Sequence, residues 1–118
     1  MLMLGLGGCR GLKPSQPTEE QLRSRIEGLL EARNSRDLEK MKTFYLDPQE
    51  AKIGNIHYLE GEITGISIDG KFAEVTVSNT FKAMGFTFKD VKRKQHWIWN
   101  GQDWFLDTRK KTNPFANK

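Results

Sequence analysis

The sequence of 118 residues has one cysteine, two histidines and no apolar run near the roughly 20 residues that cross a membrane. The single cysteine, Cys9, excludes an internal disulfide and any metal site built from cysteines. With only His57 and His96, and no carboxylates clustered at ligand spacing, we predict neither a bound metal nor a cofactor. A nucleophile elbow, a phosphate-binding glycine loop and a zinc motif are also missing.

The composition indicates one folded domain. Hydrophobic residues make up 36% of the chain, with seven phenylalanines and three tryptophans, which supplies the core of a single domain. The net charge is +4, and the surplus lies mainly in Lys92-Arg93-Lys94 and Arg109-Lys110-Lys111. A solvated strand edge explains these clusters more simply than nucleic acid, which needs a denser basic stripe, so we predict no nucleic-acid partner. Binding of anionic polymers or phospholipid headgroups is the alternative, and it would weaken steeply with added salt.

The N-terminus resembles a bacterial lipoprotein signal. Residues 1–8 have no polar side chain, and Leu6-Gly7-Gly8-Cys9 resembles a lipobox, in which the signal is cut before a cysteine that then carries lipid. The apolar segment is short and no basic residue precedes it, so we expect the natural start to lie upstream. This resemblance implies a membrane anchor at Cys9 and a location in the bacterial cell envelope. The alternative is a soluble protein with an exposed apolar N-terminus.

Residues 1–17 are therefore assigned to a signal and tether, because the stretch from Arg10 to Pro17 is rich in turn formers. Thr18-Glu19-Glu20-Gln21 is a capping box that begins a helix. Its apolar residues recur at helical spacing and predict one buried stripe: Leu22, Ile26, Leu29 and Leu30. After a break at Asn34-Ser35, Ser35 or Asp37 caps a second helix expected to end near Asp47-Pro48, and residues 48–56 form a further helical turn. The apolar positions of the second helix are Leu38, Met41, Phe44 and Tyr45.

From His57 onward the apolar period changes to two, which predicts strands. A two-residue turn at Asp69-Gly70 would put one set of side chains on the packed face of an antiparallel sheet: Ile66, Ile68, Ala73, Val75, Val77 and Phe81. The alternation loses its phase between Phe81 and Val91, so we expect a bulge or a wide loop near Met84-Gly85.

The final hairpin holds all three tryptophans. A two-residue Asn100-Gly101 turn would set Trp97 opposite Trp104. A four-residue loop would keep the same face by parity, so four residues are expected on one face beneath the first helix: Trp97, Trp99, Trp104 and Leu106.

This layout resembles the nuclear transport factor 2-like superfamily. The residues that carry the resemblance are Ala32, Asp37, Met41, Tyr45, Trp97, Asn100-Gly101, Trp104 and Leu106. It implies an α+β fold, with N-terminal helices packed on a curved antiparallel sheet to form a cone, over residues 18–108, followed by a basic tail at 109–118. A cystatin-like domain is the nearest competitor and would start with one long helix.

The resemblance leaves the function open between two classes. Enzymes of the superfamily use a buried acid, tyrosine or histidine inside the cone. The polar candidates here are Tyr45, His57, Tyr58, Asp90, His96 and Asp107, of which Asp90, His57 and Tyr58 are the candidate acids or bases of a cyclase or isomerase. None matches a catalytic motif. For His96 a packed or half-exposed role is the simpler reading, and for Asp107 a hydrogen bond at the strand end.

We therefore predict a non-catalytic module, with the cyclase or isomerase as the alternative. The module would take a small apolar molecule in its cone or a protein partner on the outer sheet face. The candidate ligand-binding residues are Tyr45, Trp97, Trp99 and Trp104, although for the tryptophans a place in the core is the simpler interpretation. An enzyme needs a cavity of roughly 300 Å³ with a polar group at its floor, whereas an interaction module predicts a cone filled by Trp and Phe. The resemblance also allows a homodimer through the sheet.

Overall fold

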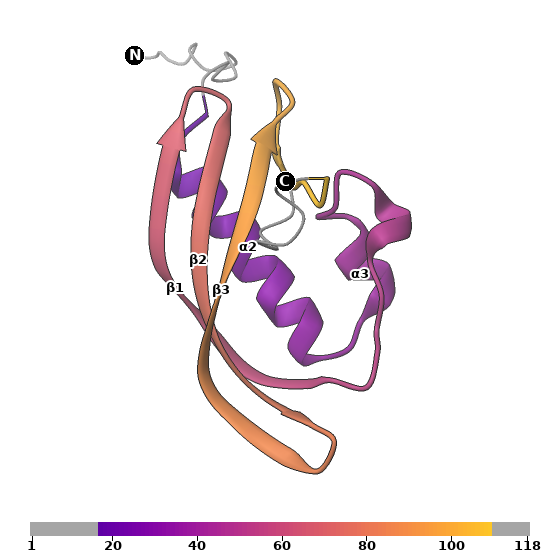
Figure 1. Ribbon diagram of the computed structural model, residues 1–118. Coiled ribbons are helices and arrows are strands. Elements are labelled where there is room, and N and C mark those ends of the chain that lie inside the picture. Colours follow the sequence, from indigo (N-terminus) through magenta and orange to yellow (C-terminus); the bar gives the residue numbers. More distant parts are fainter. Residues whose placement is uncertain (1–16, 110–118) are drawn as a thin grey trace, which may run out of the picture.

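The computed structural model describes residues 17–109, so the expected lipidation of Cys9 and nearly all of the predicted basic tail lie outside the described residues. Four strands form one antiparallel sheet in the order β1-β2-β3-β4, and α2 crosses one face of it (Figure 1). The elements are α2 (Glu19–Asn34), α3 (Leu38–Lys42), the 3-10 turn η1 (Pro48–Glu50), β1 (His57–Asp69), β2 (Phe72–Ala83), β3 (Phe86–Trp99) and β4 (Trp104–Leu106). The predicted α+β fold, with helices on a curved antiparallel sheet, is confirmed.

The predicted start of α2 is confirmed. The Thr18 hydroxyl accepts a hydrogen bond from the Gln21 N–H at 3.1 Å, and the Gln21 side chain accepts one from the Thr18 N–H at 3.0 Å. Two of the donors that every helix start leaves free are thereby satisfied. The predicted apolar stripe is buried against the sheet. It comprises Leu22, Ile26, Leu29 and Leu30.

The second helix, α3, is shorter than predicted. Asp37 caps it by accepting a hydrogen bond from the Lys40 N–H at 3.1 Å, but α3 ends at Lys42 instead of near Asp47-Pro48. Beyond it the backbone pairs with β4, because the Leu46 N–H donates to the Leu106 carbonyl at 2.9 Å and the Leu106 N–H to the Phe44 carbonyl at 2.8 Å. Phe44 therefore lies in a turn after α3 and Tyr45 in an isolated bridge to Leu106, and both are buried.

The first hairpin turns one residue later than predicted. Asp69 pairs with Phe72, so Gly70 and Lys71 form the turn, and Gly70 takes the positive φ of 64°. The pairing therefore slips by two residues. Because side chains alternate with a period of two, this slip leaves the predicted packed face unchanged.

The phase shift in β3 does not occur where it was expected. Met84 and Gly85 close a tight two-residue turn, with φ of 53° and 80°, between the paired residues Ala83 and Phe86. The bulge lies instead at Asp90, where φ is 51° and the backbone N–H donates to the Thr80 hydroxyl at 3.2 Å. One extra residue at this point restores the inward alternation of the rest of β3.

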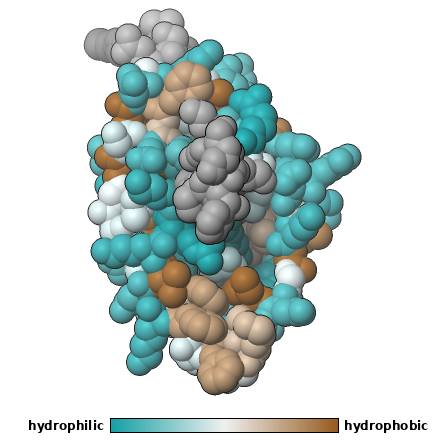
Figure 2. Space-filling model, in the orientation of Figure 1, coloured by the Kyte–Doolittle hydropathy of each residue, from teal (hydrophilic) through white to brown (hydrophobic). Residues whose placement is uncertain are grey.

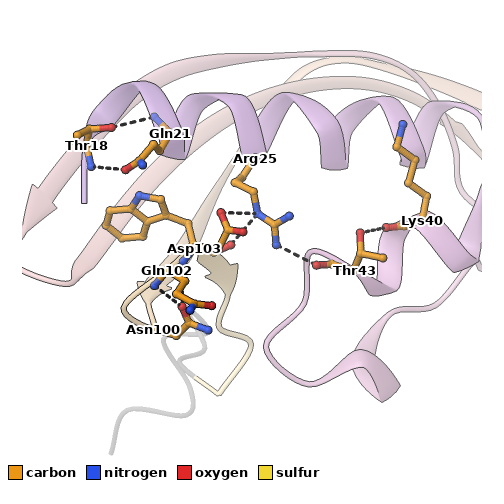
Figure 3. A network of polar contacts seen from close by, with 9 residues as sticks. Thr18, Gln21, Arg25, Lys40, Thr43, Asn100, Gln102 and Asp103 are labelled. Atoms are coloured by element: carbon orange, nitrogen blue, oxygen red, sulfur yellow. Dashed lines mark hydrogen bonds and ion pairs between the residues drawn. The ribbon is translucent and has the colours of Figure 1, made fainter. Parts of the chain in front are cut away.

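The last hairpin has a four-residue loop. Trp99 pairs with Trp104 and Trp97 with Leu106, so of the two predicted alternatives the four-residue loop is the one formed. The Asn100 side chain accepts hydrogen bonds from the N–H groups of Gln102 and Asp103, both at 2.9 Å, and this favours the longer loop (Figure 3). The predicted common face is confirmed, since the three tryptophans and Leu106 are all buried.

Arg25 joins α2 to two distant segments. Its guanidinium donates to the Trp104 carbonyl and to the Thr43 carbonyl, both at 2.9 Å, and lies 4.0 Å from the Asp103 carboxylate (Figure 3). The rings of Phe44 and Phe105 lie 4.6 and 4.9 Å from its central carbon. One polar side chain thus fixes where the helix meets the final hairpin.

The β2–β3 hairpin extends from the body and carries exposed apolar side chains. Figure 2 shows brown and tan surface gathered at the lower end of the molecule, where Figure 1 places this hairpin. Met84 is 83% exposed and Phe86 66% exposed. Within residues 17–109 no helix is long and apolar enough to span a membrane.

Candidate functional site

A pocket of about 340 Å³ opens where the end of α2, the segment after α3, the inner residues of β1 to β3 and the end of β4 meet. Its lining comprises Arg33, Tyr45, Ile56, Tyr58, Asn79, Phe81, Arg93, Lys94, Gln95, His96, Leu106, Asp107 and Thr108. These residues come from six parts of the chain. The pocket therefore exists only when the whole sheet and α2 are assembled.

Three basic residues, Arg33, Arg93 and Lys94, line this pocket. The Arg33 guanidinium lies 5.6 Å from the centre of the Tyr58 ring and donates a hydrogen bond to the Tyr45 hydroxyl at 3.3 Å. Among residues 17–109, neither Arg33 nor Arg93 has a carboxylate within ion-pair distance. Lys94 lies 3.8 Å from Glu74. The half-buried Arg33 is thus a cation without a counter-ion in the described part of the chain.

Two buried amides line the pocket. Gln95 accepts a hydrogen bond from the Trp97 indole N–H at 2.9 Å, which fixes its orientation. Asn79 is 5% exposed, and its carboxamide makes no hydrogen bond with any other described residue. Gly61, which pairs with Asn79 across the strands, makes room for it, because a Cβ at Gly61 would lie 2.5 Å from Asn79 Oδ1. Because Asn79 lines the pocket, its carboxamide is available to hydrogen-bond a molecule bound there.

An aromatic wall faces these polar groups. The ring centres of Tyr58 and Phe81 are 5.8 Å apart, and Phe81 stacks on Phe88 at 5.3 Å. Tyr58 and Phe81 are half-buried and line the pocket. The pocket therefore offers flat apolar surface beside hydrogen-bonding groups, the combination typical of small-molecule sites.

The structure separates the three predicted acid or base residues. Tyr58 lines the pocket, whereas His57 is exposed at the start of β1 and does not. Asp90 is exposed at the β3 bulge, beside a hollow of about 40 Å³ that it shares with Glu60 and Glu62. No two of the three predicted residues therefore meet at this site.

The predicted ligand-binding residues are also divided. Tyr45 lines the 340 Å³ pocket, but none of the three tryptophans does. Trp99 and Trp104 lie in the core with ring centres 5.6 Å apart, and Trp97 also borders a second pocket of about 200 Å³. The tryptophans thus form the core beneath α2.

His96 and Asp107 are neighbours where β4 ends, and both border the two larger pockets. The Asp107 N–H donates to the His96 carbonyl at 2.7 Å. The Asp107 carboxylate, 6% exposed, accepts the Arg109 N–H at 3.0 Å and its guanidinium at 2.8 and 2.9 Å. These hydrogen bonds raise the pKa of Arg109. The strand-end hydrogen bond expected of Asp107 is therefore present.

Sequence reasoning missed Arg33, Asn79 and Gln95, which give the pocket its chemistry together with Arg93 of the predicted basic cluster Lys92-Arg93-Lys94. The sequence pattern could have indicated Arg33, Asn79 and Gln95. Asn79 and Gln95 are polar residues at inward positions of strands whose other inward residues are apolar, and Arg33 follows Leu29 and Leu30 at helical spacing. In the part of the chain that the structure describes, no group of His, Cys, Asp and Glu side chains could hold a metal ion.

No protein-family model matches the sequence, and no curated protein matches it. Two solved structures share its fold. A protein from Thiobacillus denitrificans, described as a calcium/calmodulin-dependent protein kinase type II association domain, aligns with a TM-score of 0.52 and 11% identity over 80% of this chain and 93% of its own. A protein from Streptomyces avermitilis, described as a dehydratase of the nuclear transport factor 2-like family, aligns with a TM-score of 0.51 and 13% identity over 74% and 90%. At these identities the likeness establishes the nuclear transport factor 2-like fold alone.

Proposed function

We propose that this domain is a non-catalytic module that binds a small molecule in the 340 Å³ pocket. The observation that carries the proposal is a cavity lined by the buried amides Asn79 and Gln95 together with aromatic surface. Its volume falls within the roughly 300 to 1,000 Å³ typical of small-molecule sites. One protein of the same fold is described as a dehydratase of the nuclear transport factor 2-like family, which agrees with a small-molecule site in this fold.

The non-catalytic part of the proposal rests on the separation of the candidate acids and bases. A cyclase or isomerase needs an acid or base within hydrogen-bond reach of the bound substrate. Only Tyr58 of the predicted three lines the pocket. The cavity has the size expected of the enzyme alternative, which would depend on Tyr45, Tyr58, His96 or Asp107. Of these, the Asp107 carboxylate is already held by Arg109.

Two neighbouring residues of β3 provide a matched test. Arg93 and Lys92 are both exposed, but they point to opposite faces of the strand, and only Arg93 lines the pocket. Arg93→Trp places an indole at the pocket, whereas Lys92→Trp makes the same change of charge and size outside it. Both proteins and the wild type would be purified from the natural host, denatured, and their released small molecules identified by mass spectrometry.

We expect one compound in the wild type and in Lys92→Trp, and its loss from Arg93→Trp. Circular dichroism of the three proteins controls for folding. Finding no compound in any of them, or equal amounts in all three, would refute the proposal. Conversion of the compound by the wild type but not by Tyr58→Phe would establish the enzyme alternative.

We also propose that Cys9 anchors the domain to a bacterial membrane, facing the cell envelope. Support comes from the sequence alone, where the apolar residues 1–8 lead into Leu6-Gly7-Gly8-Cys9. With the gene at its natural locus, the wild type should fractionate with membranes and show the mass of a chain that starts at acylated Cys9. Cys9→Ala should leave the membrane fraction. A wild-type chain that keeps residues 1–8 without lipid would contradict the anchor.

A further inference from the structure

The unpaired polar groups in the pocket indicate which class of ligand it binds. The Arg33 guanidinium has no carboxylate partner within residues 17–109, and the buried Asn79 amide has no hydrogen-bond partner there. A purely apolar ligand would cover both groups without satisfying either, which costs free energy on binding. The lining therefore disfavours the apolar ligand that the sequence predicted.

Arg33 and Asn79 belong to the same corner of the pocket. A Cβ at Gly61 would lie 2.5 Å from Asn79 Oδ1 and 3.3 Å from Leu30 Cδ2, so Leu30 of α2 packs beside the Asn79 amide. Arg33 follows Leu30 by three residues and so projects from the same side of the helix. Both side chains also line the same pocket.

The charge balance of the pocket favours a negative ligand. Arg33 and Arg93 line it without an ion-pair partner among residues 17–109, Lys94 pairs with Glu74, and Asp107, the only carboxylate among the described lining residues, pairs with Arg109. A planar guanidinium matches the two oxygens of a carboxylate or a phosphate, and the amide of Asn79 adds a donor. Tyr58 and Phe81 then supply flat surface for an apolar or aromatic part.

We propose that the pocket takes a small organic anion, with its acidic group at Arg33 and Asn79 and its apolar part against Tyr58 and Phe81. This rests on the proposed function, since it names the ligand class of the same site. Carboxylates and phosphate esters share the required chemistry.

Three probe molecules of similar shape test whether the pocket prefers a negatively charged ligand. Benzoate and benzamide differ mainly in charge, and phenyl phosphate replaces the carboxylate by a phosphate. Binding of each to the purified full chain would be measured by amide chemical-shift titration at constant ionic strength up to millimolar concentration. We expect benzoate or phenyl phosphate to bind at least about tenfold more tightly than benzamide, and added salt to weaken the stronger binding. The anion that binds more tightly shows whether the pocket prefers a carboxylate or a phosphate.

Two variants and one control test whether Arg33 and Asn79 bind the anion. Arg33→Gln and Asn79→Leu should each lower the affinity for the preferred anion by about tenfold or more, while leaving the weak affinity for benzamide within about twofold. Arg23→Gln is the matched control, because Arg23 is an exposed arginine of the same helix that pairs with Glu19 and does not line the pocket. Arg23→Gln removes the same charge and should leave the affinity for each probe unchanged.

The outcomes separate this inference from the function it rests on. Equal binding of benzamide and the anions, or unchanged anion binding in Arg33→Gln with the fold intact by circular dichroism, would overturn the anionic ligand while leaving a small-molecule site. A neutral compound released by the host-purified wild type would do the same. If no probe binds and no compound is released, both proposals fail together.

Discussion

At the scale of single residues, Arg25 shows how a charged side chain can hold a fold together. Its guanidinium is half-buried, and this burial lowers its pKa, an effect that the nearby Asp103 carboxylate partly opposes. Two backbone carbonyls and two aromatic rings surround the charged group. Hydrogen bonds that involve an ionised group contribute more to stability than neutral ones.

We expect Arg25→Met to lower the free energy of unfolding by about 2 kcal/mol, because methionine keeps the apolar stem but leaves the carbonyls of Thr43 and Trp104 without this donor. Arg23→Met, on the same helix but exposed, should change it by no more than about 0.5 kcal/mol. Urea unfolding followed by circular dichroism measures both. Equal stability of the two variants would show that the Arg25 contacts do not stabilise the fold.

At the scale of elements, the glycine in the middle of α2, Gly28, is explained by its contact with Phe44. Glycine inside a helix usually costs about 1 kcal/mol relative to alanine. At Gly28, however, an added Cβ would lie 2.6 Å from Phe44 Cζ and 2.9 Å from Phe44 Cε1. The absence of a side chain lets the buried Phe44 ring pack directly on the helix backbone.

Gly28→Ala is therefore expected to destabilise the protein by about 1 to 3 kcal/mol, in spite of the better helix propensity of alanine, because the core there is already full. Gly54→Ala serves as the comparison, since nothing lies within 4 Å of its added Cβ. It should be neutral or up to about 1 kcal/mol more stable. Thermal unfolding of both variants checks the difference, and a stabilised Gly28→Ala would mean that Phe44 moves aside freely.

At the scale of the whole molecule, the three tryptophans report on one shared core. Trp97, Trp99 and Trp104 come from β3 and β4 and are covered by α2, whose contacts reach both ends of the sheet. A core of this kind, in a single small domain, favours one cooperative unfolding transition.

Tryptophan fluorescence should accordingly resist quenching by acrylamide in the native protein and become accessible in a single step, at the same urea concentration as the loss of circular dichroism. The physical reason is that no tryptophan can reach solvent before α2 leaves the sheet. Quenching that rises well below this transition would instead show that the final hairpin opens by itself.

The sequence by itself determined which segments are helices and strands and which side chains face inward. The capping box at Thr18, the stripe from Leu22 to Leu30 and the common face of the three tryptophans all follow from periods of 3.6 and 2, which are properties of neighbouring residues. The predicted inward face holds in spite of the wrong register of the first hairpin, because that slip was by an even number of residues.

Only the tertiary structure decided the end of α3, the bulge at Asp90 and the chemistry of the pocket. Each depends on partners far apart in the chain: Leu106 pairs with the segment after α3, Thr80 accepts from Asp90, and Asn79 lies against Gly61 near α2. Periodicity is local, whereas these contacts form only when the sheet curves around the helix. The sequence alone therefore could not identify Arg33 and Asn79 as parts of one site.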